Sequence, residues 1–514
     1  MAFLTSSERA FAGAVSRVVY ANPFLPERTE GERAALGADW SPTGPLWHAR
    51  ADLDTNPNLA KLAARVESLA GTLRQRLRRG APPDAAERAL YEDLVVYLLF
   101  DRYQADLYAV IETPETATRR VDCYDRFARD LEHYLPEGAD AFPLRREGPH
   151  LFACFFQVRR AFHYTFRDIL GGSLPAARLR AAVWQSIFTH DVRRYRRALY
   201  RRMDDIATLI SGPSGTGKEL VARAIGFSRY IPFEPGPRRF TQDFTAGVHA
   251  LNLSALSPTL IESELFGHRR GAFTGALEDR PGWLETCPPR GSVFLDEIGE
   301  VDVAIQVKLL RVLQTRTFQR LGETRDRTFH GKLVAATNRD LASEMRTGRF
   351  RPDLYYRLCS DLILTPSLRE QLRDAPGELR TLLRALAARI AGDEEADAVA
   401  GETERWIADH LGPEYPWPGN VRELEQCVRN VLVRGEYRPP DPLAPGDARE
   451  TLARALLAGG LTADELLRRY CTLVYARTGN YVETARRLGL DRRTVRERID
   501  PALLAELRAG ESAP

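Results

Sequence analysis

The sequence predicts a multidomain protein with a mostly helical N-terminal region, an α/β core that carries a helical lid, and a C-terminal all-α helix-turn-helix. Three observations predict this fold class. Apolar residues recur at helical spacing up to about residue 182, and short β-like runs then alternate with helical stretches from Ala207. Short helical segments separated by glycines close the chain. Its 514 residues are enough for roughly two to five domains.

The composition is that of a globular protein without a dominant charge. Hydrophobic residues make up 44% and charged residues 28%, and 73 basic against 70 acidic residues leave a net charge of +3. Any nucleic-acid contact must therefore come from a local basic patch. Only four residues are lysines: Lys61, Lys218, Lys308 and Lys332.

Cysteine usage and the apolar runs indicate the compartment. Six scattered cysteines without a CxxC pair predict reduced thiols in a cytoplasm rather than disulfides or a zinc site. The first residues lack the pattern of a signal peptide, and the longest apolar run, 94–100, is too short to span a bilayer. We therefore expect a cytoplasmic protein with no membrane contact.

The N-terminal region, residues 1–182, is expected to be a helical regulatory or sensory domain whose signal the sequence does not specify. Apolar residues at spacings of three and four predict helices over 59–73 and 85–111. A coiled coil is the alternative to an ordinary buried face. The aromatic-rich segment 150–170 predicts a further helix in a packed core, and an aromatic-lined ligand pocket is the alternative there.

The rest of the chain divides by the rhythm of its predicted elements. Four β-like runs are 207–211, 248–253, 292–295 and 332–336. Their alternation with helices is typical of a parallel sheet with crossover helices. The expected boundaries are 183–366 for the α/β core, 367–435 for the helical lid, 436–460 for a proline-rich linker, and 461–514 for the C-terminal unit.

A glycine-rich loop between a predicted strand and a predicted helix is the clearest binding motif. Its residues are Gly212, Pro213, Ser214, Gly215, Thr216, Gly217 and Lys218, followed by Glu219. Glycines let successive backbone N–H groups converge on a phosphate, the next helix adds its positive N-terminal end, and Lys218 can reach the β- and γ-phosphates. We therefore expect a P-loop that binds ATP; a chance glycine-rich turn is the alternative.

Two acids follow an apolar run and complete the predicted catalytic site. A P-loop usually has Ser or Thr as a Mg²⁺ ligand at the position that Glu219 occupies here. Mg²⁺ must then be held by another group, and we assign this role to Asp296, directly or through water. Glu297 can orient and polarise the attacking water. An ordinary acidic N-cap of the next helix is the alternative.

The segment 262–276, ESELFGHRRGAFTGA, indicates a family. A match to its last six residues, GAFTGA, arises by chance in a chain of this length roughly once in 10⁵. With its neighbours, the segment resembles the central AAA+ P-loop ATPase domain of bacterial enhancer-binding proteins, the activators of sigma-54 RNA polymerase. The resemblance extends from about Ser186 to Arg434, with a further match at the C-terminus, and does not reach residues 1–182.

The resemblance implies a role for each motif residue. Gly212 to Glu219 match Walker A, including its glutamate, and Asp296 and Glu297 match Walker B. The other matches are Asn252, which restrains the catalytic glutamate until the sigma factor is engaged; Asn338, sensor I; Arg351 and Arg357, which are offered to a neighbouring subunit's nucleotide; and Arg422, sensor II. Arginines from the next protomer compensate transition-state charge, and such head-to-tail contacts close into a ring, which the family implies is a hexamer. Surface salt bridges are the alternative for the two arginines.

The GAFTGA segment is expected to be a moving loop that contacts sigma-54. Its residues are Gly271, Ala272, Phe273, Thr274, Gly275 and Ala276. The glycines give backbone freedom on either side of an exposed Phe273-Thr274 tip, and an exposed aromatic is unfavourable unless it docks on a partner. By resemblance the partner is sigma-54, while a β-turn with a buried phenylalanine is the alternative.

The C-terminal unit has the spacing of a helix-turn-helix. Helices are predicted over 466–477, 482–488 and 492–499, with a glycine turn before the last one. The unit resembles the Fis-type DNA-binding module of many enhancer-binding proteins. The expected DNA-binding residues are Arg486, Arg487, Arg492, Arg493, Thr494, Arg496 and Arg498. A basic face on a small helical bundle is the alternative.

These observations lead to one favoured function and two alternatives. The favoured protein is a bacterial, cytoplasmic ATPase that uses Mg²⁺ and ATP, binds double-stranded DNA upstream of a promoter, and remodels the closed complex of the sigma-54 RNA polymerase holoenzyme. The first alternative is a DNA-binding repressor in which nucleotide acts only as a ligand that switches its activity. The second is an AAA+ remodeller of another protein.

Overall fold

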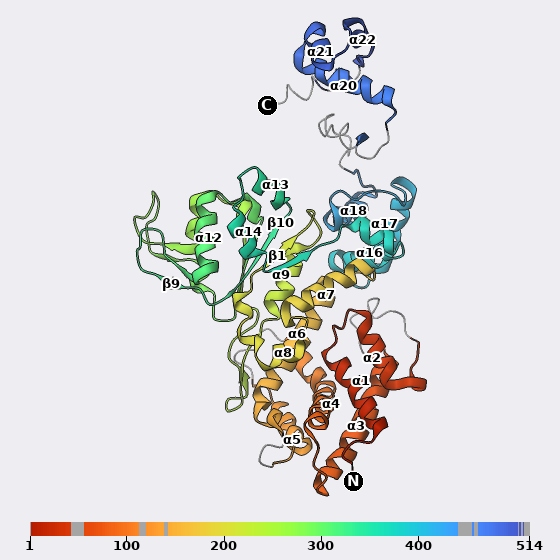
Figure 1. The fold of residues 1–514 in the computed structure, drawn as a ribbon, viewed down its shortest axis with the longest axis vertical. Coiled ribbons are helices and arrows are strands. Elements are labelled where there is room, and N and C mark those ends of the chain that lie inside the picture. The colour runs from red at the N-terminus through yellow and green to blue at the C-terminus, as the bar shows by residue number, and fades with distance from the viewer. Residues whose placement is uncertain are drawn as a thin grey trace. The chain divides into compact units, whose positions relative to one another are not determined.

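The computed structural model describes residues 2–42, 56–112, 120–137, 142–439, 455–456, 461–501, 503–504 and 507 (Figure 1). They form two compact units, Met1–Val428 and Arg429–Pro514. The linker predicted at 436–460 lies outside the described residues except for 436–439 and 455–456. The five-part division of the chain stays a prediction.

The described N-terminal residues are largely helical. The helices are α1 (Ser6–Tyr20), α2 (Pro26–Leu36), α3 (Pro57–Arg78), α4 (Ala85–Ile111), α5 (Tyr124–Tyr134), α6 (Gly148–Asp168), α7 (Leu174–Phe188) and α8 (Val192–Arg197). Capping boxes stabilise the N-terminal ends of two of these helices: Thr5 with Glu8 caps α1, and Asp84 with Glu87 caps α4. The three helices predicted in this region are confirmed by α3, α4 and α6.

A parallel five-stranded sheet forms the centre of the first unit. Its order is β11 (Asp361–Leu364), β1 (Thr208–Ser211), β10 (Lys332–Thr337), β7 (Ser292–Asp296) and β4 (Val248–Asn252). The four predicted strands are confirmed, but β11 was not predicted. Only Ile363 of this edge strand is buried, while Leu362 and Leu364 are exposed, so its sequence lacks the apolar run that marks a central strand.

Helices and short hairpins surround the sheet. The core helices are α9 (Lys218–Phe227), α10 (Pro258–Phe266), α11 (Trp283–Thr286), α12 (Val303–Thr315), α13 (Leu341–Arg346) and α14 (Pro352–Leu358). The hairpins pair β2 (Phe233–Glu234) with β3 (Arg239–Phe240), β5 (Gly267–His268) with β6 (Arg280–Pro281), and β8 (Thr317–Phe318) with β9 (Arg327–Thr328). The predicted lid consists of α15 (Leu368–Asp374), α16 (Glu378–Ala391), α17 (Ala396–His410) and α18 (Asn420–Arg434).

The N-terminal helices share a hydrophobic core with one face of the sheet. That core runs from Phe3 to the strand residues Phe294 and Val334. Their neighbours Leu295 and Leu333 belong to a second core, because successive strand residues point to opposite faces. Both α6 and α7 pack against α9, the helix that follows the P-loop (Figure 1). The packed aromatic core expected around 150–170 is therefore present, and it touches the P-loop helix.

In the described part of the second unit, three helices lie near the C-terminus of the chain. They are α20 (Ala463–Thr478), α21 (Tyr481–Leu488) and α22 (Arg492–Glu497). Thr462 and Glu465 form a capping box on α20, and Gly479 and Gly489 end α20 and α21 in the left-handed conformation. In the described part of the chain, none of the helices has the length and apolar character that crossing a bilayer demands.

Lys332 is a buried cation at the start of β10. It is fully buried, and its ammonium donates a hydrogen bond of 2.6 Å to the carbonyl of Ile206. Burial lowers the pKa of Lys332 from 10.5 to about 7, because a charged amine loses its hydration there. Between these two pKa values, the unfolded chain binds a proton that the folded chain has released, so wild-type stability rises with pH over this range.

We therefore expect Lys332→Met to raise the free energy of unfolding by on the order of 3 kcal/mol below pH 7. The gain should shrink as the pH rises from 7 to 10.5. Urea unfolding at pH 6, 8 and 10 measures it. Lys308→Met is the matched control, since Lys308 is half exposed and pairs with Glu262 at 2.7 Å. If the increase in the free energy of unfolding does not change with pH, the lowered pKa of Lys332 is not its cause.

Candidate functional site

The P-loop connects β1 to α9 and is shaped by its glycines. Gly215 and Gly217 have φ values of 77° and 86°, which residues other than glycine rarely adopt. A Cβ on Gly215 would also lie 2.1 Å from the carbonyl oxygen of Gly419 in the lid. The loop therefore follows the strand–loop–helix path that was predicted, with the lid backbone directly against it.

Lys218 places its ammonium inside this loop. The Nζ atom donates to the carbonyl oxygens of Gly212 and Pro213 at 3.0 and 3.1 Å. Burial lowers the pKa of Lys218, and the nearby carboxylates of Glu297 and Asp296 oppose this shift. The positive charge thus lies between the loop carbonyls and the two acids, where the terminal phosphates of a nucleotide bind in a P-loop.

Asp296 and Glu297 lie at the carboxyl end of β7, the edge at which parallel sheets bind ligands. Glu297 has left-handed backbone angles (φ 56°, ψ 49°), a conformation that non-glycine residues adopt rarely outside functional sites. Its carboxylate accepts a hydrogen bond of 3.3 Å from the backbone N–H of Asn338, and Asp296 accepts one of 3.0 Å from the N–H of Glu297. The structure thus brings together the residues predicted as Walker B and sensor I.

Asn252 lies beside Asp296 in register, on the neighbouring strand β4. Its side-chain oxygen accepts hydrogen bonds from the N–H and hydroxyl of Ser254 at 3.0 and 2.7 Å. Glu297 is hydrogen-bonded instead to the backbone N–H of Asn338 and to the carboxylate of Asp296. Asn252 is therefore correctly placed on the sheet edge, but in this conformation it holds the turn after β4 rather than the glutamate.

The lid contacts the P-loop through two residues of the segment GNVREL. Arg422, assigned to sensor II in the helical lid, donates to the hydroxyl of Ser214 at 3.2 Å. The amide of Asn420 donates to the backbone carbonyl of Ser214 at 2.8 Å and accepts from the N–H of Leu368 at 2.9 Å. Sequence reasoning missed Asn420, although it lies only two residues before Arg422.

The two predicted trans-acting arginines differ in their surroundings. Arg351 forms a two-pronged ion pair with Asp353, with N–O distances of 3.0 and 2.7 Å. Arg357 is exposed on α14, and no ion pair engages it among the described residues. The alternative of a surface salt bridge therefore describes Arg351 but not Arg357.

The GAFTGA loop connects β5 to β6. Gly271 and Gly275 have φ values of 81° and 101°, and the N–H of Gly271 donates to the carbonyl of Ala276 at 2.9 Å to close the loop. Thr274 is exposed, as predicted, but Phe273 is only half exposed and packs edge-on against His268 with 5.0 Å between ring centroids. Phe273 is therefore less exposed than the tip was expected to be, because its ring packs against an imidazole of the same hairpin.

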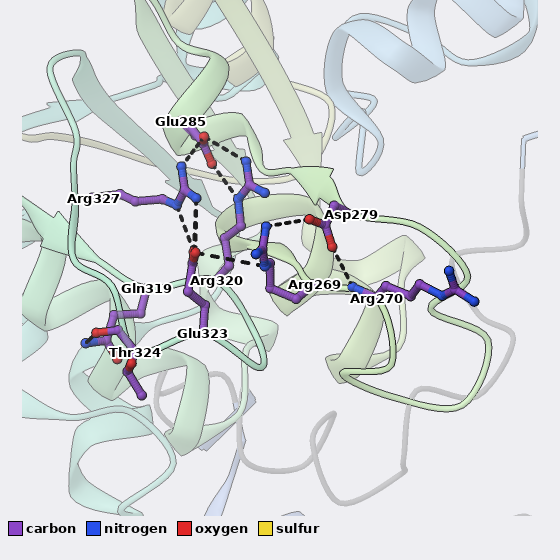
Figure 2. Close-up of polar contacts among 9 residues, drawn as sticks. All are labelled: Arg269, Arg270, Asp279, Glu285, Gln319, Arg320, Glu323, Thr324 and Arg327. Atoms are coloured by element: carbon purple, nitrogen blue, oxygen red, sulfur yellow. Dashed lines mark hydrogen bonds and ion pairs between the residues drawn. The ribbon is translucent and has the colours of Figure 1, made fainter.

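A network of ion pairs joins the base of this loop to the β8–β9 hairpin (Figure 2). Glu285 accepts from Arg320 at 2.8 Å and pairs with Arg327, which also pairs with Glu323 at 3.0 Å. Arg269 then pairs with Asp279 and approaches Glu323 at 4.0 Å. Several partly buried charges that share partners are coupled more strongly than isolated surface pairs. The sequence did not reveal this network.

We expect Glu285→Gln to loosen the loop, because Arg320 and Arg327 lose a shared carboxylate. Hydrogen exchange of the backbone amides from 269 to 280 should become about tenfold faster, as an opening free energy lowered by about 1.4 kcal/mol requires. Glu278→Gln removes an exposed carboxylate from the same hairpin and should leave the exchange rates unchanged. Equal exchange in both variants would show that the network does not hold the loop.

The C-terminal unit places the predicted DNA-binding residues on α21 and α22, except Arg498, which follows the last residue of α22. Val495 anchors α22 in the interior, while Arg492, Arg493 and Arg496 are exposed. Four of the arginines form local ion pairs: Arg486 and Arg487 with Glu483, Arg493 with Glu497, and Arg498 with Asp464. Thr494 is half buried. Helix α22 ends at Glu497, so it is shorter than the predicted 492–499.

The comparisons with known proteins agree with this site. Residues 188–363 match the family described as the sigma-54 interaction domain. The chain is 41% identical over 296 residues to the transcriptional regulatory protein ZraR of Escherichia coli O157:H7, an alignment that covers 57% of this chain and 62% of that protein. It is 44% identical over 228 residues to the Nif-specific regulatory protein of Azotobacter vinelandii, covering 44% of this chain and 40% of that protein.

A solved structure of NtrX from Brucella abortus in complex with ATP aligns with a TM-score of 0.39 at 20% identity, over 89% of this chain and 98% of that chain. The alignments to the two curated relatives span less than two thirds of the length of either one. Both of those alignments are longer than the matched family region, which includes the P-loop, Asp296, Glu297 and the GAFTGA loop. Residues 188–363 therefore match a sigma-54 interaction domain, and over this region and beyond it the chain is similar to transcription regulators.

Proposed function

We propose that this protein is an ATP-hydrolysing transcription activator. It binds double-stranded DNA upstream of a promoter through α21 and α22, assembles into a ring, and uses ATP hydrolysis to drive its GAFTGA loops against the sigma-54 RNA polymerase holoenzyme. One observation carries the proposal: a single sheet edge brings Lys218, Asp296, Glu297 and Asn338 together. A protein that used nucleotide only as a switch would need no positioned glutamate.

The residues of the site divide the work of hydrolysis among them. Backbone N–H groups of the P-loop and Lys218 hold the phosphates, and Arg422 contacts the loop from the lid. The carboxylate of Glu297 accepts a hydrogen bond from the attacking water and thereby orients it. No group of three or more His, Cys, Asp or Glu in the described residues could hold a metal alone. Asp296 would hold Mg²⁺, which usually binds one or two carboxylates plus phosphates and waters and which neutralises charge on the phosphates.

Assembly follows from the exposure of Arg357. Arg357 on the surface of α14 has no ion-pair partner among the residues that the structure describes, and it can reach the nucleotide of the next protomer. Such a contact repeats head to tail until a ring closes. A hexamer is the ring size that the family resemblance implies. Because hydrolysis then requires two protomers, the rate per protomer should rise with protein concentration.

Promoter opening tests the proposal directly. With sigma-54 holoenzyme, promoter DNA, ATP and Mg²⁺, wild-type protein should make the melted bases reactive to permanganate. Thr274→Ala should keep its ATPase rate within about twofold while open complexes fall at least tenfold, since Thr274 lies at the exposed tip of the loop. Glu278→Ala, in the same hairpin, should behave as wild type.

The other outcomes favour the alternatives. Promoter DNA that stays closed with wild-type protein, while ATP is hydrolysed, would favour an AAA+ remodeller of another target. Bound DNA without any hydrolysis would favour a nucleotide-switched repressor.

A further inference from the structure

A cavity of about 150 Å³ lies inside the N-terminal helical region. Helices α1, α4, α6 and α7 supply most of its wall, with Phe155, Phe162 and Trp184 among its aromatic residues. The lining is mainly apolar with a few polar groups, which is the usual composition of a small-molecule site. An apolar cavity of about this size admits a molecule such as benzene.

Two hydrogen-bond donors in the wall of this cavity lack an acceptor. The indole Nε1–H of Trp184 and the Nε–H of Arg196 are buried without a hydrogen-bond partner in the described part of the protein, and only 4% of Trp184 is exposed. An unpartnered buried donor is costly, so such groups are normally satisfied. A ligand that brought an acceptor atom within hydrogen-bond distance of either donor would satisfy that donor.

One helix lies between this cavity and the P-loop helix. Leu151, Phe155 and Val158 of α6 line the cavity, whereas Gln157 and Arg160 are on the opposite face, because a helix turns by 100° per residue. The opposite face caps the C-terminal end of α9. Arg160 donates to the carbonyls of Phe227 and Arg229 at 2.6 Å each, and Gln157 donates to the carbonyl of Ser228 at 2.9 Å.

These bonds form a stiff connection. Arg160 is fully buried and stacks on Phe156, with its guanidinium carbon 4.5 Å from the ring centroid. Its positive charge lies at the negative end of the α9 dipole. Lys218 is the first residue of α9, so the ten-residue helix that α6 contacts at its C-terminal end begins at the lysine of the P-loop.

We propose that this cavity is an effector site for a small, mainly apolar molecule of about one ring that carries a hydrogen-bond acceptor, and that α6 couples the site to nucleotide binding at the P-loop. The coupling rests on the proposed function, since it requires a nucleotide at Lys218. The cavity itself does not. Occupancy moves the α6 face that contacts α9, so effector and nucleotide alter each other's affinity by the same factor.

Acetophenone is a suitable probe, because it combines a ring with a carbonyl acceptor, and ethylbenzene has nearly the same shape without the acceptor. Ligand-observed NMR with the full chain should detect acetophenone binding with a Kd below about 1 mM. Val158→Phe fills the cavity and should weaken binding at least tenfold. Ala64→Phe enlarges an exposed residue of α3 outside the cavity and should leave the Kd unchanged. Trp184→Phe should lower the preference for acetophenone over ethylbenzene at least threefold.

The coupling is tested at equilibrium, without hydrolysis. Saturating acetophenone should change the Kd of a non-hydrolysable ATP analogue at least threefold, and the analogue should change the Kd of acetophenone equally. Arg160→Met should abolish the mutual change in Kd while acetophenone still binds. Gln157→Met, which removes one of the three hydrogen bonds at the C-terminal end of α9, should make that change in Kd smaller. A folded wild type that binds neither probe, or a Val158→Phe variant that binds acetophenone as wild type does, would overturn the effector site.

Binding of acetophenone without any change in nucleotide affinity would overturn the coupling alone. A chain that binds acetophenone but no nucleotide would refute the proposed function and leave the cavity assignment standing. The two failures are therefore distinguishable.

Discussion

Replacing Arg357 with alanine should lower the ATPase rate by about three orders of magnitude while the protein still binds nucleotide. The exposed guanidinium of Arg357 makes no ion pair in the described part of its own chain, so it can compensate the charge that develops on a neighbour's phosphates. Steady-state kcat and the Kd of a fluorescent ATP analogue measure the two effects. Arg346→Ala removes an arginine with 71% of its side chain exposed on α13 and should keep the wild-type rate.

Mixing two inactive variants tests whether Arg357 acts on another protomer. Lys218→Ala protein cannot hold nucleotide but still offers Arg357, whereas Arg357→Ala protein holds nucleotide but does not offer Arg357. Their mixture should recover a measurable fraction of wild-type ATPase activity. If the mixture stays as inactive as its components, Arg357 does not work in trans, and the ring mechanism loses its main support.

Replacing Glu297 with glutamine should lower the rate of ATP hydrolysis at least about 100-fold, because an amide orients the attacking water without accepting its proton. Nucleotide affinity should stay equal or increase, since one negative charge near the phosphates is removed. Single-turnover hydrolysis and equilibrium nucleotide binding measure the two quantities. Glu234→Gln, at an exposed position in the β2–β3 hairpin, is the control that should change neither.

The result for Glu297 also separates two functional hypotheses. In an activator driven by hydrolysis, Glu297→Gln should abolish open-complex formation. Transcriptional output that is unchanged in this variant would favour the nucleotide-switched repressor, because that protein needs only to bind nucleotide.

The sequence alone predicted the features that depend on short stretches of chain. Helices α3, α4 and α6 could be predicted from local apolar spacing. The P-loop could be predicted from its glycines, which readily adopt the positive φ angles that the loop requires. Asp296 and Glu297 come at the end of an apolar strand, so their place at the carboxyl edge of the sheet could be predicted from the sequence, whereas Asn338 was assigned by the family resemblance. For the helices, the P-loop and the two acids, the residues that decide the outcome are close neighbours in the sequence.

Only the tertiary structure decided how distant segments meet. The bonds from Arg160 to α9 join residues 67 and 69 positions apart, and the contact from Asn420 to Ser214 spans 206 positions. Edge strand β11 was missed because its pairing with β1, rather than its own apolar pattern, makes it a strand. The effector cavity, the ion network at the loop base and the half-buried Phe273 have the same cause: packing and charge pairing depend on which surfaces come together, and local residue patterns do not encode that.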